Sequence, residues 1–140
     1  MESRQTTIDV DVSPPTVFDF ITNVERRTEW QLHLSKVEKL SDEPVAVGTR
    51  FRDFSKFGTS TLLVEECDAP NRFVYGSDGG PFQVRVEWNL EPLDTGTRID
   101  VSISFAPRSF MKLLWPLLRR SALGQVEKDF VELQRVAKTL

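Results

Sequence analysis

The chain has 140 residues, of which 39% are hydrophobic and 28% charged, and it carries 10 Phe, 3 Trp and 1 Tyr. This length fits one domain over residues 1–140 with an apolar core, which excludes whole-chain disorder. The 18 basic and 21 acidic side chains give a net charge of −3, whereas a protein that grips nucleic acid through its phosphates is expected to be basic, so we predict no nucleic-acid partner.

A single Cys and a single His exclude an internal disulfide, a Cys-rich zinc site and a multi-His metal site. We therefore predict no metal and no cofactor. The N-terminal residues MESRQTTIDVDVS lack the basic and apolar regions of a signal peptide, and no apolar stretch reaches the roughly 18 residues of a membrane span. A cytoplasmic protein is expected, with Cys67 as a reduced structural thiol.

The first elements are a strand and one or two short helices. Residues 6–12 alternate between apolar and polar side chains, which predicts a half-buried strand. A Ser-Pro-Pro sequence at residues 13–15 is typical of a helix start, and apolar residues at helical spacing predict a helix to about residue 23. A second helical turn is expected at residues 25–30.

Five clusters of turn-forming residues follow at short intervals. They lie at residues 43–48, 56–58, 68–71, 78–81 and 94–96. The segments between them are interpreted as about six strands, and two of these, 82–90 and 98–105, alternate strictly between apolar and polar residues. Short turns between consecutive strands predict antiparallel hairpins. One face of the sheet is then exposed to solvent, and the other is covered by a further element.

A C-terminal helix over residues 109–137, about 45 Å long, is predicted to cover the apolar face of the sheet. Its apolar residues form one broad stripe: Phe110, Leu113, Leu114, Leu117, Leu118, Val126, Phe130, Leu133 and Ala137. Charged residues, Asp129 among them, are expected to lie mostly outside this stripe. Pro116 is expected to kink the helix or to split off a short first helix. A strongly curved sheet covers such a helix better than a flat one.

The order of elements resembles the START-related helix-grip superfamily, in its SRPBCC or polyketide cyclase/dehydrase-like branch. Four segments carry the resemblance in the right order: IDVDVSPPTVFDFITNVERRTEW, VGTRF, VEECDAPNRFVY and PRSFMKLLWPLLRR. In the first of them, Asn23 and Thr28 stand where this branch usually has Asp and Pro. The resemblance implies an α+β helix-grip fold, in which a curved antiparallel sheet of six or seven strands wraps around the long C-terminal helix. Members of the superfamily include lipid and hormone carriers, aromatase/cyclases and chaperone regulators, so fold does not decide activity.

The resemblance also implies a cavity between sheet and helix, and the inward positions supply candidates for its wall. The predicted ligand-binding residues are Trp30, Phe51, Asp53, Phe73, Tyr75, Trp88, Phe105, Met111, Leu114, Trp115 and Leu118, with Phe82 as a further candidate. The alternative is that these aromatic side chains fill the interior and leave a small pocket or none.

Two polar positions are weak catalytic candidates. Asp53 shares the strand phase of Phe51, and a carboxyl group in an apolar cavity suits a general acid or a hydrogen bond to a ligand. Tyr75 is the second candidate proton donor or acceptor. The alternative for Asp53 is that the strand twists and leaves it wet. His33, the only histidine, is interpreted as a surface or packing residue rather than a catalytic group.

The segment SFMKLLWPLLRR has two interpretations. It is apolar and flanked by basic residues, so it could touch a membrane surface and gate a lipid-like ligand. The overall negative charge favours the other interpretation, a helix that faces the core while its basic residues are solvated.

Three functions follow, in order of preference. The first is non-catalytic binding or carriage of a hydrophobic small molecule, either lipid-like or an aromatic polyketide-like compound. The second is a cyclase/dehydratase-type enzyme that uses a cavity Asp or Tyr. The third is a protein-interaction module with a vestigial cavity. A monomer or a homodimer is expected.

Overall fold

The computed structural model of the protein describes residues 1–140 and contains one seven-stranded antiparallel sheet with three helical segments. The strands are β1 (Glu2–Val10), β2 (Leu34–Lys39), β3 (Arg50–Ser55), β4 (Gly58–Asp68), β5 (Arg72–Ser77), β6 (Phe82–Leu93) and β7 (Gly96–Pro107). The helical segments are α1 (Pro14–Thr22), the 3-10 helix η1 (Val24–Glu29) and α2 (Met111–Ala137). The predicted α+β helix-grip architecture, with two short helices after the first strand, is confirmed.

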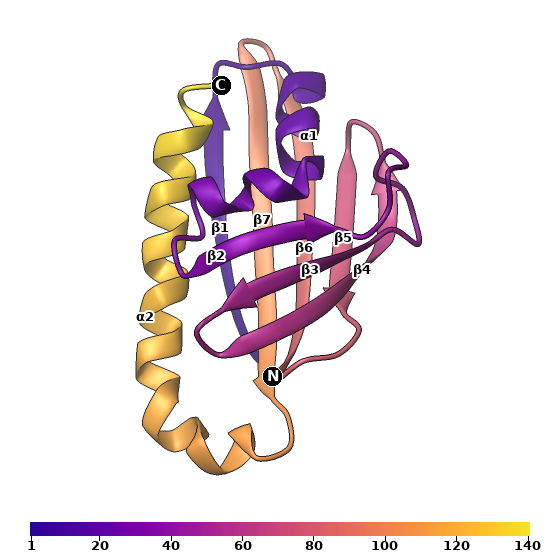
Figure 1. The fold of residues 1–140 in the computed structure, drawn as a ribbon. Coiled ribbons are helices and arrows are strands. Elements are labelled where there is room, and N and C mark those ends of the chain that lie inside the picture. Colours follow the sequence, from indigo (N-terminus) through magenta and orange to yellow (C-terminus); the bar gives the residue numbers. More distant parts are fainter.

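The sheet is a meander in which six strands follow one another and the first strand closes the far edge. Its order is β1-β7-β6-β5-β4-β3-β2, so β1 pairs with β7 while β2 to β7 lie beside their sequence neighbours. The sheet curls, so that β2 and β3 cross in front of β6 and β7 (Figure 1). The helix α2 runs along the open side of this half-barrel, next to β1 and β7 (Figure 1).

The strictly alternating segments behave as predicted. In β7 the side chains of Ile99, Val101, Ile103 and Phe105 are all buried, and in β6 those of Val86, Trp88 and Leu90 are buried. The antiparallel register places Val86 opposite Ile103 and Trp88 opposite Val101, so the two apolar faces form one continuous inner wall.

Aromatic side chains fill the part of the interior that lies under α1 and η1. Trp30 packs edge-on against Trp88 with a centroid distance of 5.8 Å, and Tyr75 packs against Phe51 at 5.2 Å and Phe73 at 5.4 Å. All five rings are at most 2% exposed. This part of the molecule is a packed core, because aromatic pairs at these distances leave no space for a ligand.

The C-terminal helix differs from its prediction in two ways. It is one helix from Met111 to Ala137 with Pro116 inside it, so no short first helix splits off, although its axis bends near the N-terminal end (Figure 1). Its apolar residues also do not form a single inward stripe. Leu113 and Leu117 are 82% and 81% exposed, because the curled sheet does not reach this side of the first turns.

Candidate functional site

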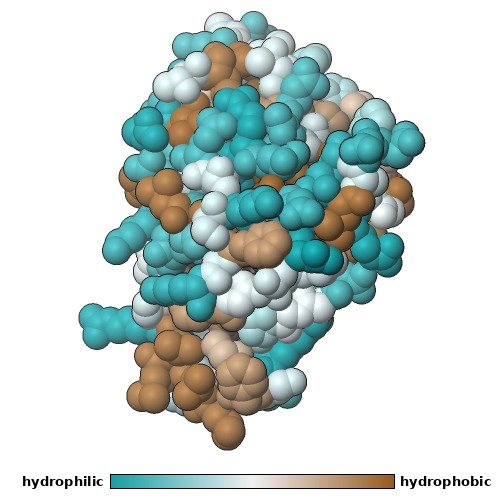
Figure 2. Space-filling model, viewed as in Figure 1, coloured by the Kyte–Doolittle hydropathy of each residue, from teal (hydrophilic) through white to brown (hydrophobic).

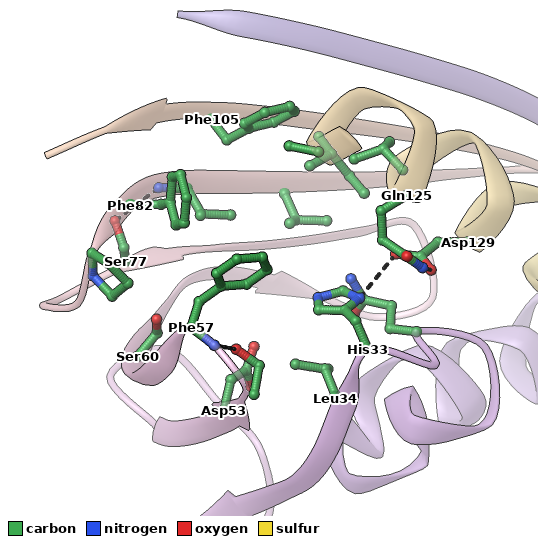
Figure 3. Close-up of a pocket in the computed structure, with 18 of the residues that line it drawn as sticks. His33, Leu34, Asp53, Phe57, Ser60, Ser77, Phe82, Phe105, Gln125 and Asp129 are labelled. Atoms are coloured by element: carbon green, nitrogen blue, oxygen red, sulfur yellow. Dashed lines mark hydrogen bonds and ion pairs between the residues drawn. The ribbon is translucent and has the colours of Figure 1, made fainter. Parts of the chain in front are cut away.

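A hollow with a largely apolar wall lies between the curled sheet and the middle of α2. It is a half-enclosed pocket of about 200 Å³ lined by 23 residues, 11 of them hydrophobic. Strands β6 and β7 supply its apolar wall through the inward positions Phe82, Val84, Val86, Ile103 and Phe105, and α2 closes it with Leu118, Ala122 and Val126. Figure 3 shows Phe57, Phe82 and Phe105 around this wall, opposite His33 and Leu34.

One end of the pocket is polar. Here η1 and the segment after it bring Arg27, Gln31 and His33 close to Asp53 from β3 and to Gln125 and Asp129 from α2. An apolar cavity with a few placed polar groups at one end is typical of small-molecule sites, because burial of the apolar part supplies affinity and the polar groups fix orientation.

A buried ion pair anchors this polar end. The guanidinium group of Arg27 donates from Nη1 to Asp53 Oδ1 at 2.8 Å and from Nη2 to Asp53 Oδ2 at 2.9 Å, and its Nε donates to Gln31 Oε1 at 2.8 Å. Arg27 also lies over the rings of Tyr75 and Phe51, at 5.3 and 5.5 Å from their centroids. Burial acts to lower the pKa of Arg27, but attraction by Asp53 outweighs it and the pKa is raised above its usual value.

A second polar pair joins α2 to the segment before β2. Asp129 is 2% exposed, its Oδ1 accepts a hydrogen bond from Gln125 Nε2 at 2.9 Å, and its Oδ2 lies 3.4 Å from His33 Nδ1. His33 Nδ1 is buried and makes no hydrogen bond. The imidazole points into the pocket beside Asp129 (Figure 3). The pair can orient the ring and present its other nitrogen to a bound molecule.

Three of the eleven predicted ligand-binding residues line the pocket: Asp53, Phe105 and Leu118. The further candidate Phe82 lines it as well. Asp53 is neither exposed to solvent nor a carboxyl group alone in an apolar cavity, as the two sequence interpretations had it. It is 8% exposed and both its oxygens are bound by Arg27. It is therefore held in a structural pair and not free to act as a proton donor.

The other eight predicted residues do not line the pocket. Trp30, Phe51, Phe73, Tyr75 and Trp88 belong to the packed aromatic core, and burial raises the pKa of the Tyr75 hydroxyl. Met111 is buried under the start of α2, and Leu114 is 42% exposed. Trp115 on α2 packs edge-on against two residues of the wall, 6.0 Å from the ring of Phe82 and 5.8 Å from that of Phe105. The strand phase of the aromatic residues was correct, but phase alone does not distinguish a filled interior from an open one.

Sequence reasoning missed Arg27, Gln31, Gln125 and Asp129, although two of these carry a readable signal. Residues three apart eclipse in a 3-10 helix, and Arg27 lies three residues from both Val24 and Trp30, which are buried. Asp129 lies three residues after Val126 and four before Leu133, on the inner stripe of α2. The prediction that Asp129 lies outside this stripe was wrong.

The sequence matches the family described as "Polyketide cyclase / dehydrase and lipid transport" over residues 1–138. The chain belongs to this family. No curated protein sequence matches the chain significantly. The match to the family model confirms the SRPBCC, START-like resemblance that was inferred from the sequence.

Solved structures share the fold at low sequence identity. A START superfamily protein from Mycobacterium smegmatis has a TM-score of 0.76 at 14% identity, with 98% of this chain and 97% of that chain covered. The Zhui aromatase/cyclase from a Streptomyces species has a TM-score of 0.77 at 17% identity, with 99% and 92% covered. A protein from Thermus thermophilus has a TM-score of 0.68 at 22% identity, with 95% and 93% covered. At these identities the likeness shows the fold and leaves the ligand open.

Two further findings bear on the kind of site. No group of three or more His, Cys, Asp or Glu side chains gathers in a way that could hold a metal ion. None of the helices combines the length and the apolar character that crossing a membrane requires.

Proposed function

We propose that the protein binds and carries a small, mostly apolar molecule with one hydroxyl-bearing polar end. The pocket between α2 and the sheet supports this proposal, because it joins an apolar wall to a cluster of polar side chains at Arg27, His33 and Asp129 and is open to solvent. Its volume of about 200 Å³ lies below the roughly 300 to 1,000 Å³ of typical ligand sites, which favours a one- or two-ring aromatic compound or a short acyl chain.

The charges at the polar end indicate the chemistry of the ligand. Arg27 is neutralised by Asp53, which leaves the carboxylate of Asp129 as the charged group beside His33, while Lys56 lines the pocket from the β3–β4 turn. An anionic head group would meet this carboxylate, whereas a hydroxyl group can donate a hydrogen bond to Asp129 or His33. A neutral alcohol or phenol therefore fits better than a carboxylic acid. A cytoplasmic location and a monomeric or dimeric state remain predictions.

Isothermal titration with 2-naphthol and 2-naphthoate tests the proposal, because the two probes share a ring system and differ only in the head group. We expect 2-naphthol to bind more tightly than 2-naphthoate. Ala122→Phe places a ring inside the pocket and should weaken 2-naphthol binding by about tenfold or more. Val131→Phe, at an exposed position on the same helix, is the matched control and should bind normally.

Native mass spectrometry of the purified protein adds an independent readout, because a carrier often retains its ligand. If no apolar molecule is recovered and 2-naphthol does not bind to the wild-type protein, the carrier proposal fails. If 2-naphthoate binds as tightly as 2-naphthol, the assignment of a neutral head group is wrong while the pocket itself remains a binding site.

A second candidate function, a cyclase/dehydratase-type reaction, draws support from the His33–Asp129 pair. In this reaction the free nitrogen of His33 removes a proton from a carbon next to a carbonyl group, and the imidazolium then gives that proton to a departing hydroxyl group, which leaves as water. Asp129 stabilises the imidazolium across the 3.4 Å contact. These roles replace the earlier candidates Asp53 and Tyr75, of which the first is ion-paired and the second lies outside the pocket.

Deuterium exchange at the α-carbons of 2-tetralone, followed by NMR, tests this chemistry without knowledge of the natural substrate. We expect the wild-type protein to accelerate the exchange, and His33→Gln to remove the acceleration while 2-naphthol still binds. An exchange rate equal to that of buffer would leave the protein a carrier only. An acceleration that persists in His33→Gln would assign the base to another group.

A further inference from the structure

The start of α2 has an apolar stripe that covers nothing. Phe110, Leu113, Leu114 and Leu117 follow the spacing of one helix face, and they are 64%, 82%, 42% and 81% exposed. The adjacent face of the same turns carries Met111, Trp115 and Leu118, which contact the body of the protein. Figure 2 shows the exposed stripe as a compact hydrophobic patch at the end of the molecule where α2 begins. A contiguous patch of this kind marks an interaction site.

The β3–β4 turn adds to this patch. Phe57 in the turn is 44% exposed, its ring lies 6.3 Å from that of Phe82, and Phe82 lies 6.0 Å from Trp115 on α2. Lys56, Phe57 and Phe82 also line the pocket. The turn, one end of the pocket and the start of α2 therefore lie close together. We call the exposed residues Phe57, Phe110, Leu113, Leu114 and Leu117 the apolar tip.

The charges around the apolar tip have one sign, although the protein as a whole is acidic. Between Asp100 and Glu127 all four charged residues are basic: Arg108, Lys112, Arg119 and Arg120. Arg119 is paired with Glu2 at 2.7 Å, but Lys112 and Arg120 have no acidic partner within 4 Å, and neither has Lys56 in the β3–β4 turn. An apolar surface rimmed by free cations matches the interface of an anionic bilayer, where the apolar side chains enter the acyl boundary and the cations meet lipid phosphates.

We propose that the apolar tip docks onto an anionic lipid bilayer, with the Phe57 and Phe82 end of the pocket turned toward the lipid. A two-fold contact with a second copy of this chain would place the same patch of both copies face to face. Lys112 and Arg120 would then approach their own counterparts, and like charges oppose such a contact. Docking is separate from the proposed ligand binding, although together they would let an apolar ligand pass between bilayer and pocket without crossing water.

Vesicle co-sedimentation tests the docking with phosphatidylcholine vesicles that contain or lack phosphatidylglycerol. We expect the wild-type protein to bind the anionic vesicles and to leave them as the salt concentration rises. The double variants Leu113→Ser/Leu117→Ser and Lys112→Glu/Arg120→Glu should each lower the partition coefficient by about tenfold or more. All four side chains are exposed and lie outside the pocket, so folding and 2-naphthol binding should not change.

Matched variants elsewhere on the surface serve as controls. Val131→Ser removes an exposed apolar side chain from the other half of α2, and Lys128→Glu/Lys138→Glu changes the net charge as much as the charge variant at the tip. Both should retain vesicle binding. Absence of wild-type binding, equal binding to neutral vesicles, or binding unaffected by the tip variants would each overturn the proposal. So would a concentration-dependent dimer that Leu113→Ser/Leu117→Ser abolishes, because the tip would then be a self-association surface.

Discussion

The ion pair between Arg27 and Asp53 is the most consequential contact made by single residues. Both side chains are buried, and Arg27 donates two hydrogen bonds to Asp53 while its guanidinium group also lies over two aromatic rings. Removing one partner of a buried pair leaves the other charge without compensation, which is far more destabilising than removing the pair as a whole. The pair therefore holds η1 against β3 and forms the floor of the polar end.

Asp53→Asn should lower the free energy of unfolding by about 3 to 5 kcal/mol, because Arg27 keeps its charge in a buried place. Urea denaturation followed by circular dichroism measures the loss. The double variant Arg27→Met/Asp53→Leu should recover most of it. Asp9→Asn is the matched surface control, since Asp9 makes a similar two-bond pair with Arg98 at 2.9 and 3.1 Å in solvent, and its loss should be far smaller. Equal losses for Asp53→Asn and the double variant would contradict this account.

Among the elements, the β6–β7 hairpin and α2 each contain a glycine, and the two glycines have different effects on stability. Gly96 begins β7 where the end of β1 passes close by. A Cβ atom there would lie 1.9 Å from the carbonyl oxygen of Val10 and 2.9 Å from the Cα of Asp11. Gly124 lies inside α2, and a Cβ atom there would meet nothing within 4 Å. The first glycine is required by close backbone contact, whereas the second only weakens its helix.

Gly96→Ala should therefore destabilise the protein by about 2 kcal/mol, because two backbone segments must separate. Gly124→Ala should stabilise it by about 0.5 to 1 kcal/mol through the better helix propensity of alanine. Thermal melts of the two variants beside the wild type measure both shifts. The opposite signs make the comparison decisive, and a stabilising Gly96→Ala would show that the end of β1 is free to move.

In the molecule as a whole, the interior divides into a packed half and an open half. The packed half lies under α1 and η1, where five aromatic rings are buried together. The open half lies under α2, and its wall is set by strands β6 and β7. Ala122→Phe fills space that is already empty, so its effect on stability should be small while its effect on 2-naphthol binding is large. The filled-interior alternative therefore holds for the packed half, whereas a pocket remains in the other half.

The amino-acid sequence by itself determined the elements and their faces, since hydrophobic periodicity and turn residues act over a few neighbouring positions. The alternation in β6 and β7, the Ser-Pro-Pro start of α1 and the five turns were all readable in this way. The resemblance of four short segments to the SRPBCC branch then predicted the family and the curved sheet that wraps around the C-terminal helix.

Only the tertiary structure decided the site. Arg27 meets Asp53 and His33 approaches Asp129 across long stretches of chain, and no local pattern encodes such partners. Whether an inward aromatic residue fills the core or borders a pocket depends on how far α1 and α2 each cover the curled sheet. The same cause exposes Leu113 and Leu117, because the edge of the sheet lies short of the first turns of α2.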